Sequence, residues 1–264
     1  MQYLATFTIA LLTSVLYFTI FWIVATRIKK LWLADIAWSS GFFIVYLVVY
    51  IINKSGGIVQ NLILIMLFFW GLRLTSYLTI RNYNKEDFRY ENLKNKYGSQ
   101  WLKKSYLRIF LLQAFVLILV NSASIIATVN VKSNSITPIN YLAATIWILG
   151  FLIESIADLQ LYKFKSHSIN QGKVMNRGLW KYSRHPNYLG EILMWTGIFI
   201  LILPLQYGLI GVISPVMITV FLLKISGINL LEKKLKQKPE FETYKSETPA
   251  LIPNPKTVIK DLIR

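Results

Sequence analysis

The segment RGLWKYSRHPNYLGE, residues 177–191, joins a basic loop to the start of an apolar stretch. Arg184 and His185 stand directly before Pro186, which suits the first turn of a helix because its missing N–H costs nothing there. Glu191 follows about one turn further on. Cations at a helix mouth with a carboxylate inside the apolar part are typical of a membrane helix that faces a polar cavity.

The rest of the chain has the composition of a membrane protein. Its 264 residues are 55% hydrophobic and 14% aromatic, with a mean hydropathy of +0.47, which is too apolar for a typical soluble domain. A helix that spans a bilayer needs about 20 apolar residues. Seven stretches approach this length: 3–25, 33–52, 60–80, 107–129, 138–162, 187–203 and 206–225.

We therefore expect an all-α polytopic membrane protein with about seven transmembrane helices. The last two stretches meet at a tight turn near Pro204 and Gln206. In the alternative interpretation they form one broken or re-entrant segment. The first stretch has no basic residues before it and is interpreted as a retained helix, not a signal peptide.

The net charge of +17 is distributed unevenly. If the N-terminus lies outside, every Lys and Arg except Lys54, Lys132 and Arg73 falls in an inner loop, at an inner helix mouth or in the tail after residue 225. This is the positive-inside pattern, and it predicts an outer N-terminus and a cytosolic C-terminus. Orientation in the membrane and contact with anionic lipids account for most of these cations, so we expect no nucleic-acid partner. No obligate protein partner is evident.

Residues 1–264 are predicted to form a single membrane domain. Residues 1–106 would supply N-terminal helices and a cytosolic cap on the substrate side, with a short helix starting at "EDFRY" (86–90). Residues 107–264 would supply the cofactor-binding helices and the tail. There are no cysteines, and neither His167 nor His185 has clustered companions, so no metal site is expected. The lysine-rich, cysteine-free composition favours a bacterial inner membrane; an endoplasmic reticulum protein would show the same topology.

Five ionisable residues lie within the predicted spans and call for a cavity or a partner: Asp35, Arg73, Glu154, Asp158 and Glu191. Glu154 and Asp158 are four residues apart and therefore share one helix face, with Lys165 seven residues further on. The alternative is that these acids only stabilise the helix or pair with Arg73.

The loop before Pro186 is rich in cations and has no acid: residues 163–186 contain Lys163, Lys165, Lys173, Arg177, Lys181 and Arg184. A helix N-terminus beside basic side chains binds phosphate well. Asn187 and Glu191 share a face just inside the helix. A dinucleotide fits this pattern, with its phosphates near the cations and its ribose or nicotinamide toward Asp158, Asn187 and Glu191. No G-x-G-x-x-G occurs, which excludes a Rossmann domain.

Four motifs carry a family resemblance: "ESIADLQLYKFK", "GLWKYSRHPNYLGE", "SGINLLE" and "PEFETYKSETPALIP". With these, the chain resembles the steroid 5-alpha-reductase-like membrane family, particularly its bacterial branch of unknown function. The resemblance implies a seven-helix bundle with an NADPH site that faces the cytosol. It also implies reduction of a carbon–carbon double bond conjugated to a carbonyl in a lipidic substrate.

The resemblance also implies site residues. Its expected cofactor-binding set is Asp158, Lys165, Arg177, Tyr182, Arg184, His185, Asn187, Tyr188, Glu191, Glu232 and Tyr244, with Lys165, Arg177 and Arg184 nearest the phosphates and the last two in a tail that closes over the cofactor. Candidates for polarising the substrate carbonyl are Arg73, Asp35 and Tyr77, and Trp38, Trp70 and Glu154 are candidates for the substrate side. The steroid reductases have a tyrosine where this chain has Trp70, so a steroid substrate is not implied.

Two other functions remain open. "RHP" also occurs in isoprenylcysteine and phospholipid methyltransferases, so the same residues could hold S-adenosylmethionine. Charge separates the two enzymes, because NADPH carries several negative charges and S-adenosylmethionine carries a sulfonium. The third candidate is a non-enzymatic lipid-binding protein, which would leave Asp158, Asn187 and Glu191 unexplained.

Overall fold

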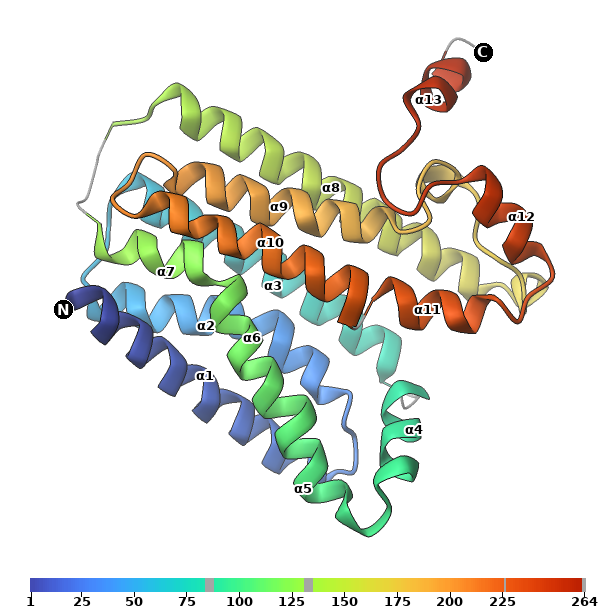
Figure 1. Ribbon diagram of the computed structural model, residues 1–264, viewed down its shortest axis with the longest axis horizontal. Coiled ribbons are helices and arrows are strands. Elements are labelled where there is room, and N and C mark those ends of the chain that lie inside the picture. The colour runs from blue at the N-terminus through green and yellow to red at the C-terminus, as the bar shows by residue number, and fades with distance from the viewer. Residues whose placement is uncertain (84–87, 131–134, 226, 263–264) are drawn as a thin grey trace. The chain divides into compact units, whose positions relative to one another are not determined.

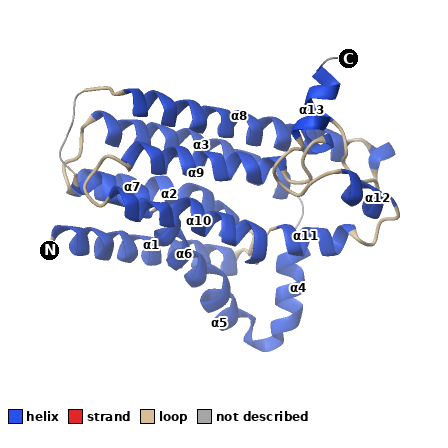
Figure 2. Cartoon of the chain, turned by 45° about the horizontal axis from the view of Figure 1, so that its top comes forward, coloured by secondary structure: helices blue, strands red, loops and turns tan. Residues whose placement is uncertain are grey.

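Every regular element in the described part of the chain is a helix (Figures 1 and 2). The computed structural model describes residues 1–83, 88–130, 135–225 and 227–262. The all-α prediction is confirmed for these residues. Lys132 and the first two residues of "EDFRY" lie outside them, and the short cap helix α4 is described from Phe88 to Tyr97.

Four helices are long and apolar enough to cross a membrane: α1 (Gln2–Arg27), α2 (Leu33–Ile52), α3 (Ile58–Asn82) and α8 (Pro138–Ser166). A fifth span results if the bent pair Asn95–Val120 and Ser122–Val129 is counted as one. Helix α9 (Pro186–Ile202) and the helical segment Gly208–Lys224, which includes α10 (Ile213–Val220), are apolar but shorter. The described residues therefore contain four or five candidate spans, and each of the seven predicted stretches contains helix.

The predicted span 107–129 is broken at Asn121. Helix α5 (Trp101–Ser105), a π-helical turn (Tyr106–Leu111) and α6 (Leu112–Val120) precede the break, and α7 (Ser122–Val129) follows it at an angle of 55°. The Asn121 side-chain amide donates to the Phe42 carbonyl (3.1 Å), and the Ala123 N–H donates to Ser214 Oγ (2.9 Å). Such contacts satisfy polar groups at a break inside a membrane segment. The prediction of one continuous helix over 107–129 is therefore wrong.

The chain divides into two compact units. The first contains residues 1–141 and 198–214, and the second contains residues 142–197 and 215–264. Residues 107–129, which the sequence analysis assigned to the cofactor part, lie in the first unit with α1, α2 and α3. The compact units therefore do not divide at 106–107, because the bent span packs on the N-terminal helices. The division into a substrate side and a cofactor side stays a prediction.

In the second unit, α8 and α9 approach each other through glycines. A Cβ on Gly190 would lie 2.5 Å from the Gly150 carbonyl oxygen, and a Cβ on Gly197 would lie 2.8 Å from the Ala143 carbonyl oxygen. Small residues allow this close packing of membrane helices. The unit also contains the short helices α11 (Ile228–Leu235), α12 (Glu240–Glu247) and α13 (Pro255–Leu262).

Candidate functional site

Carboxylates are buried where α8 packs on α9. Glu154 and Asp158 on α8 are 3% and 4% exposed, and Glu191 on α9 is 7% exposed. The Asn187 side-chain N–H donates to Asp158 Oδ1 at 3.3 Å, so the structure brings these two predicted site residues together. The other side-chain atom of Asn187, Oδ1, is buried and accepts no hydrogen bond from the residues that the structure describes. It is an acceptor that a bound polar group could use.

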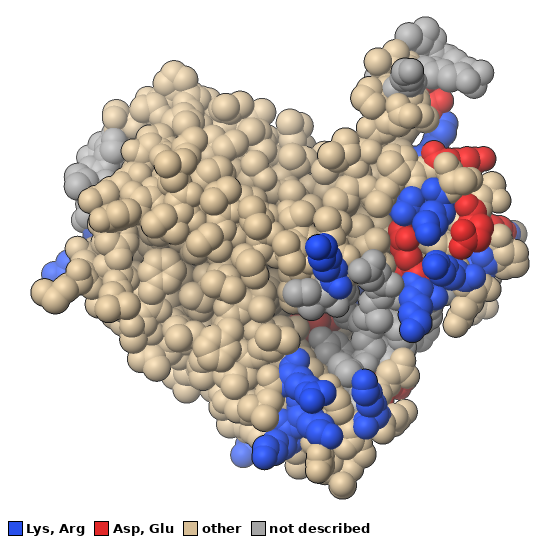
Figure 3. All heavy atoms as spheres, in the orientation of Figure 1, with Lys and Arg blue, Asp and Glu red and all other residues tan. Residues whose placement is uncertain are grey.

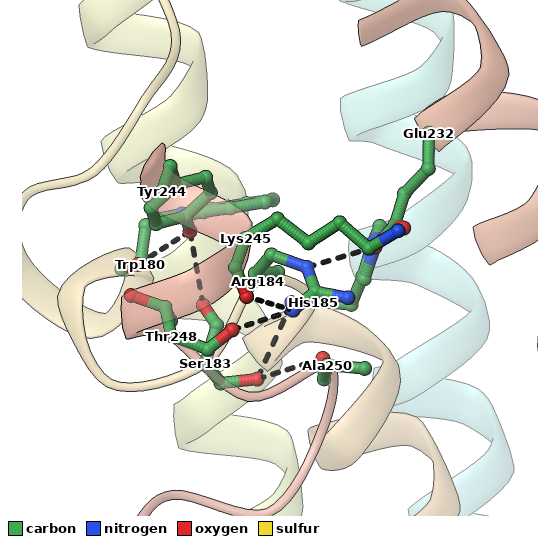
Figure 4. Close-up of polar contacts among 9 residues, drawn as sticks. All are labelled: Trp180, Ser183, Arg184, His185, Glu232, Tyr244, Lys245, Thr248 and Ala250. Carbon is green, nitrogen blue, oxygen red and sulfur yellow. Dashed lines mark hydrogen bonds and ion pairs between the residues drawn. The ribbon is translucent and has the colours of Figure 1, made fainter. Parts of the chain in front are cut away.

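The basic loop is held by the tail through three side chains, which we call the clamp: Arg184, His185 and Glu232 (Figure 4). Arg184 Nε lies 2.8 Å from Glu232 Oε1, and His185 Nε2 lies 3.2 Å from the same oxygen. Another guanidinium nitrogen of Arg184 donates to the carbonyls of Lys245 and Thr248. Arg184 therefore joins the loop to both α11 and the end of α12.

Backbone contacts extend the clamp. The N–H groups of Arg184 and His185 donate to the carbonyls of Pro249 (2.9 Å) and Ala250 (3.1 Å). The Tyr244 hydroxyl donates to the Trp180 carbonyl (Figure 4). The tail thus packs against the loop around the start of α9. The resemblance predicted a tail that closes over the cofactor, and that stays a prediction. The direct pairing of Glu232 with Arg184 and His185 was not predicted.

The clamp has a defined charge state at neutral pH. Burial raises the pKa of Glu232, but hydrogen bonds from Arg184 and His185 outweigh burial and hold that pKa below its ordinary value. Burial lowers the pKa of His185 despite its contact with Glu232. His185 is therefore neutral at pH 7, and since Glu232 is an ionised acceptor, the proton of the imidazole lies on Nε2.

A second contact joins the loop to the C-terminal helix. Asp261 on α13 accepts a hydrogen bond from the Tyr182 hydroxyl (3.0 Å) and pairs with the Lys181 ammonium. The hydrogen bond to Asp261 is the main cause that raises the pKa of Tyr182. The ring of His185 stacks on Tyr188 at 5.4 Å. Asp261 was not singled out in the sequence, because nothing local links it to a loop about 80 residues earlier.

The remaining cations of the loop lie on the surface. Arg177 is exposed and has no side-chain partner among the described residues, and Lys165 is exposed on the last turn of α8. Gly178, at φ +58°, lies against the side chain of Gln160, which also accepts the Leu179 N–H (3.0 Å). This anchor on α8 presents Arg177 outward.

A pocket of about 500 Å³ lies elsewhere in the second unit. It is lined by Asn176, Lys181, Glu240, Thr243, Tyr244, Glu247, Thr248 and Thr257. Tyr244 is the one predicted site residue on this wall, and the buried carboxylates of α8 and α9 do not line it. Since two glutamates and one lysine face it, the pocket suits a phosphate poorly.

The predicted substrate-side residues, apart from Glu154, lie in the first unit. Trp38 and Trp70 are 9% and 2% exposed, and each ring packs edge-on against Phe42, at 5.0 Å and 5.3 Å. Both tryptophans therefore belong to the hydrophobic core. Phe42 was not predicted, because its contacts come from two different helices.

Arg81 links two of the predicted catalytic residues in that unit. Its guanidinium lies 3.9 Å from Asp35 Oδ2 and 5.8 Å from the centre of the Tyr77 ring. Arg73, on the same helix α3, has two buried guanidinium nitrogens. Arg81 was not among the predicted site residues, although its position four residues after Tyr77 on one helix face was a signal for it.

Comparison with known proteins identifies relatives but no activity. Residues 21–248 match the family described as "Protein of unknown function (DUF1295)". An uncharacterized protein of Schizosaccharomyces pombe, C594.04c, is 25% identical over 90% of this chain and 75% of its own length. A second uncharacterized protein of that yeast, C7D4.09c, is 29% identical over 41% of this chain and 38% of its own length. No solved structure matches the chain.

Proposed function

Because the chain belongs to the DUF1295 family, we propose that it is a membrane reductase of the steroid 5-alpha-reductase-like type. In this proposal it uses NADPH to reduce a carbon–carbon double bond conjugated to the carbonyl of a steroid-like or isoprenoid lipid. It crosses the membrane seven times, with its N-terminus outside and its C-terminus in the cytosol, in a bacterial inner membrane or an endoplasmic reticulum.

One observation carries the proposal: the hydrogen-bonded Asp158–Asn187 pair with its unused acceptor, Asn187 Oδ1. Ribose hydroxyls and a carboxamide N–H are donors that such buried acceptors hold well. These residues therefore fit NADPH, which supplies a hydride when bound. Asp158, Asn187 and Glu191 would bind and orient its uncharged end.

The exposed cations of the loop would hold the phosphates in this proposal. Arg184 is already engaged by Glu232 and two carbonyls, so we assign it to positioning the loop. Arg177 has its guanidinium available for a bidentate contact with the 2′-phosphate that distinguishes NADPH from NADH. Lys165 would add positive charge nearby.

The substrate carbonyl requires a donor or a positive charge where negative charge develops during reduction. Arg73 and Tyr77 are our candidates in the first unit. Asp35 has a guanidinium 3.9 Å away, so we propose it as the residue that positions Arg81 beside Tyr77. Tyr77 would then donate its phenolic proton, with the cation holding the ring in place.

One observation favours a methyltransferase as the second candidate. Glu154, Asp158 and Glu191 are all buried in one unit, and carboxylates stabilise a cation such as the sulfonium of S-adenosylmethionine. The exposed Lys165 and Arg177 would then contribute only to topology.

Ligand protection of the purified protein in detergent separates the two candidates. Melting is followed with NADPH, NADH, S-adenosylmethionine or S-adenosylhomocysteine at equal concentrations. NADPH at about a hundred times its dissociation constant should stabilise by about 2.7 kcal/mol. Arg177→Ala should narrow the gap between NADPH and NADH, and the exposed Lys236→Ala serves as the control. Protection by S-adenosylmethionine or S-adenosylhomocysteine with none by NADPH would overturn the reductase proposal.

A further inference from the structure

Cations gather at one end of the first unit, over α5 (Figure 3). Lys103 and Lys104 lie on α5, and Arg108 lies on the π-helical turn that follows. The end of α1 packs against this segment: the Trp22 indole N–H donates to Ser105 Oγ (3.2 Å), and its ring lies 4.9 Å from that of Tyr106. Aromatic residues beside cations at the end of an apolar helix are typical of the interface between membrane and water.

Lys104 and Arg108 share one aromatic ring. The Lys104 ammonium lies 5.7 Å from the centre of the Tyr97 ring, and the Arg108 guanidinium lies 5.9 Å from it. Tyr97 is only 8% exposed, so both cations contact a ring that is buried in the fold. Like charges four residues apart repel each other, and no carboxylate of the described residues pairs with either. An anion between them would remove this repulsion.

An apolar stripe continues from these cations. Leu112, Phe115 and Leu119 follow Arg108 at the three- and four-residue spacing of one helix face, and they are 47%, 48% and 44% exposed. Such side chains contact acyl chains in a protein that spans a membrane. The surface therefore presents two cations at the end of a stripe that favours hydrocarbon.

We propose that Lys104 and Arg108 bind the phosphate of an anionic phospholipid whose acyl chain lies along Leu112, Phe115 and Leu119. The charge of the pair selects a lipid with a net negative headgroup, since the ammonium of a zwitterionic headgroup would be repelled. The stripe selects a lipid over a soluble phosphate ester. This site is independent of the proposed NADPH site, which lies in the other unit.

Native mass spectrometry of the detergent-solubilised full chain tests this lipid site. Phosphatidylglycerol, phosphatidylcholine and inorganic phosphate are titrated in separate experiments. Phosphatidylglycerol should remain bound, with an affinity that falls as salt rises. The double variant Lys104→Gln/Arg108→Gln should weaken its binding about 30-fold, from the usual contribution of a basic residue near an anionic surface. The double variant Lys233→Gln/Lys236→Gln removes two exposed charges, one on α11 and one in the turn that follows it, and should bind like the unmodified protein.

Three outcomes would overturn the lipid site. They are equal retention of phosphatidylcholine, equal occupancy by inorganic phosphate, and unchanged binding in Lys104→Gln/Arg108→Gln. If that variant does not fold, Phe115→Ser tests the same site through the acyl chain and should weaken phosphatidylglycerol while leaving inorganic phosphate unaffected. Failure of these experiments would leave NADPH protection unchanged, because that readout depends on the second unit.

Discussion

Arg184 and Glu232, 48 positions apart, lie with Nε and Oε1 at 2.8 Å, and this contact joins the loop before α9 to the tail. Their side chains are 10% and 11% exposed. Because Nη1 of the same guanidinium donates to the carbonyls of Lys245 and Thr248, Arg184 also contacts the end of α12. In the proposed function, Arg184 is thus a positioning residue for the motif that contains Asn187.

The first prediction concerns Glu232. Glu232→Gln removes the negative charge that balances Arg184 in a buried setting, and loss of one partner there costs about 3 kcal/mol. We expect a lower melting temperature and faster proteolysis within residues 236–254. Glu242→Gln, an exposed change on α12, should alter neither. Equal behaviour of the two variants would mean that the clamp does not hold the tail.

The second prediction concerns pH and His185. Its pKa is lower in the folded protein than its ordinary value of 6.5, so the unfolded chain binds a proton first as pH falls. Stability should therefore decline below pH 6.5 until the folded-state pKa is reached. Glu232, whose pKa is also lowered, adds a decline only below 4.5. His185→Gln should flatten the dependence of the melting temperature on pH between pH 7 and pH 5.5. An unchanged slope there would contradict the lowered pKa of His185.

The third prediction concerns the buried acceptors. Asp158→Asn and Glu191→Gln each remove a charged acceptor that contributes about 1.5–3 kcal/mol to a bound donor, which corresponds to about tenfold or more in the dissociation constant of NADPH. The melting temperature without ligand should fall much less than the affinity. Collapse of the ligand-free protein in either variant would show that the carboxylate is instead needed for folding.

The fourth prediction concerns the contact between α8 and α9. Gly190→Ala places a methyl group 2.5 Å from the Gly150 carbonyl, so the helices must separate, at a cost of about 1–3 kcal/mol. Because Asp158 and Asn187 are on these two helices, NADPH affinity should fall together with melting temperature. Gly56→Ala, where the added methyl group meets nothing within 4 Å, is the matched control and should change neither quantity.

The fifth prediction concerns topology. Reporter fusions after residue 55 and after residue 264 should report opposite sides of the membrane, the first outside and the second in the cytosol. In the proposed arrangement, both the N-terminus and the α2–α3 connection are outside. A cytosolic reporter at residue 55 together with a cytosolic C-terminus would refute the seven-span arrangement.

Much of the local structure was predictable from the sequence. The stretches 3–25, 33–52, 60–80 and 138–162 agree with α1, α2, α3 and α8 to within four residues at each end. A helix in a membrane satisfies its own backbone groups, so apolar length alone identifies it. The proximity of Asp158 and Asn187 was also foreseen, because both lie near the same mouth of consecutive helices.

The sequence by itself determined helix content, the positions of the apolar segments and the residues that need a polar environment, since each depends on neighbours within a few turns. Only the tertiary structure decided which partners those residues take. The break at Asn121 depends on Phe42 and Ser214, and Arg184 pairs with Glu232 because folding brings α11 against the loop. Partners so far apart in the chain leave no periodic signal in the sequence. A charged residue in a loop gives the same sequence pattern whether it contacts a ligand, a lipid or the protein's own tail.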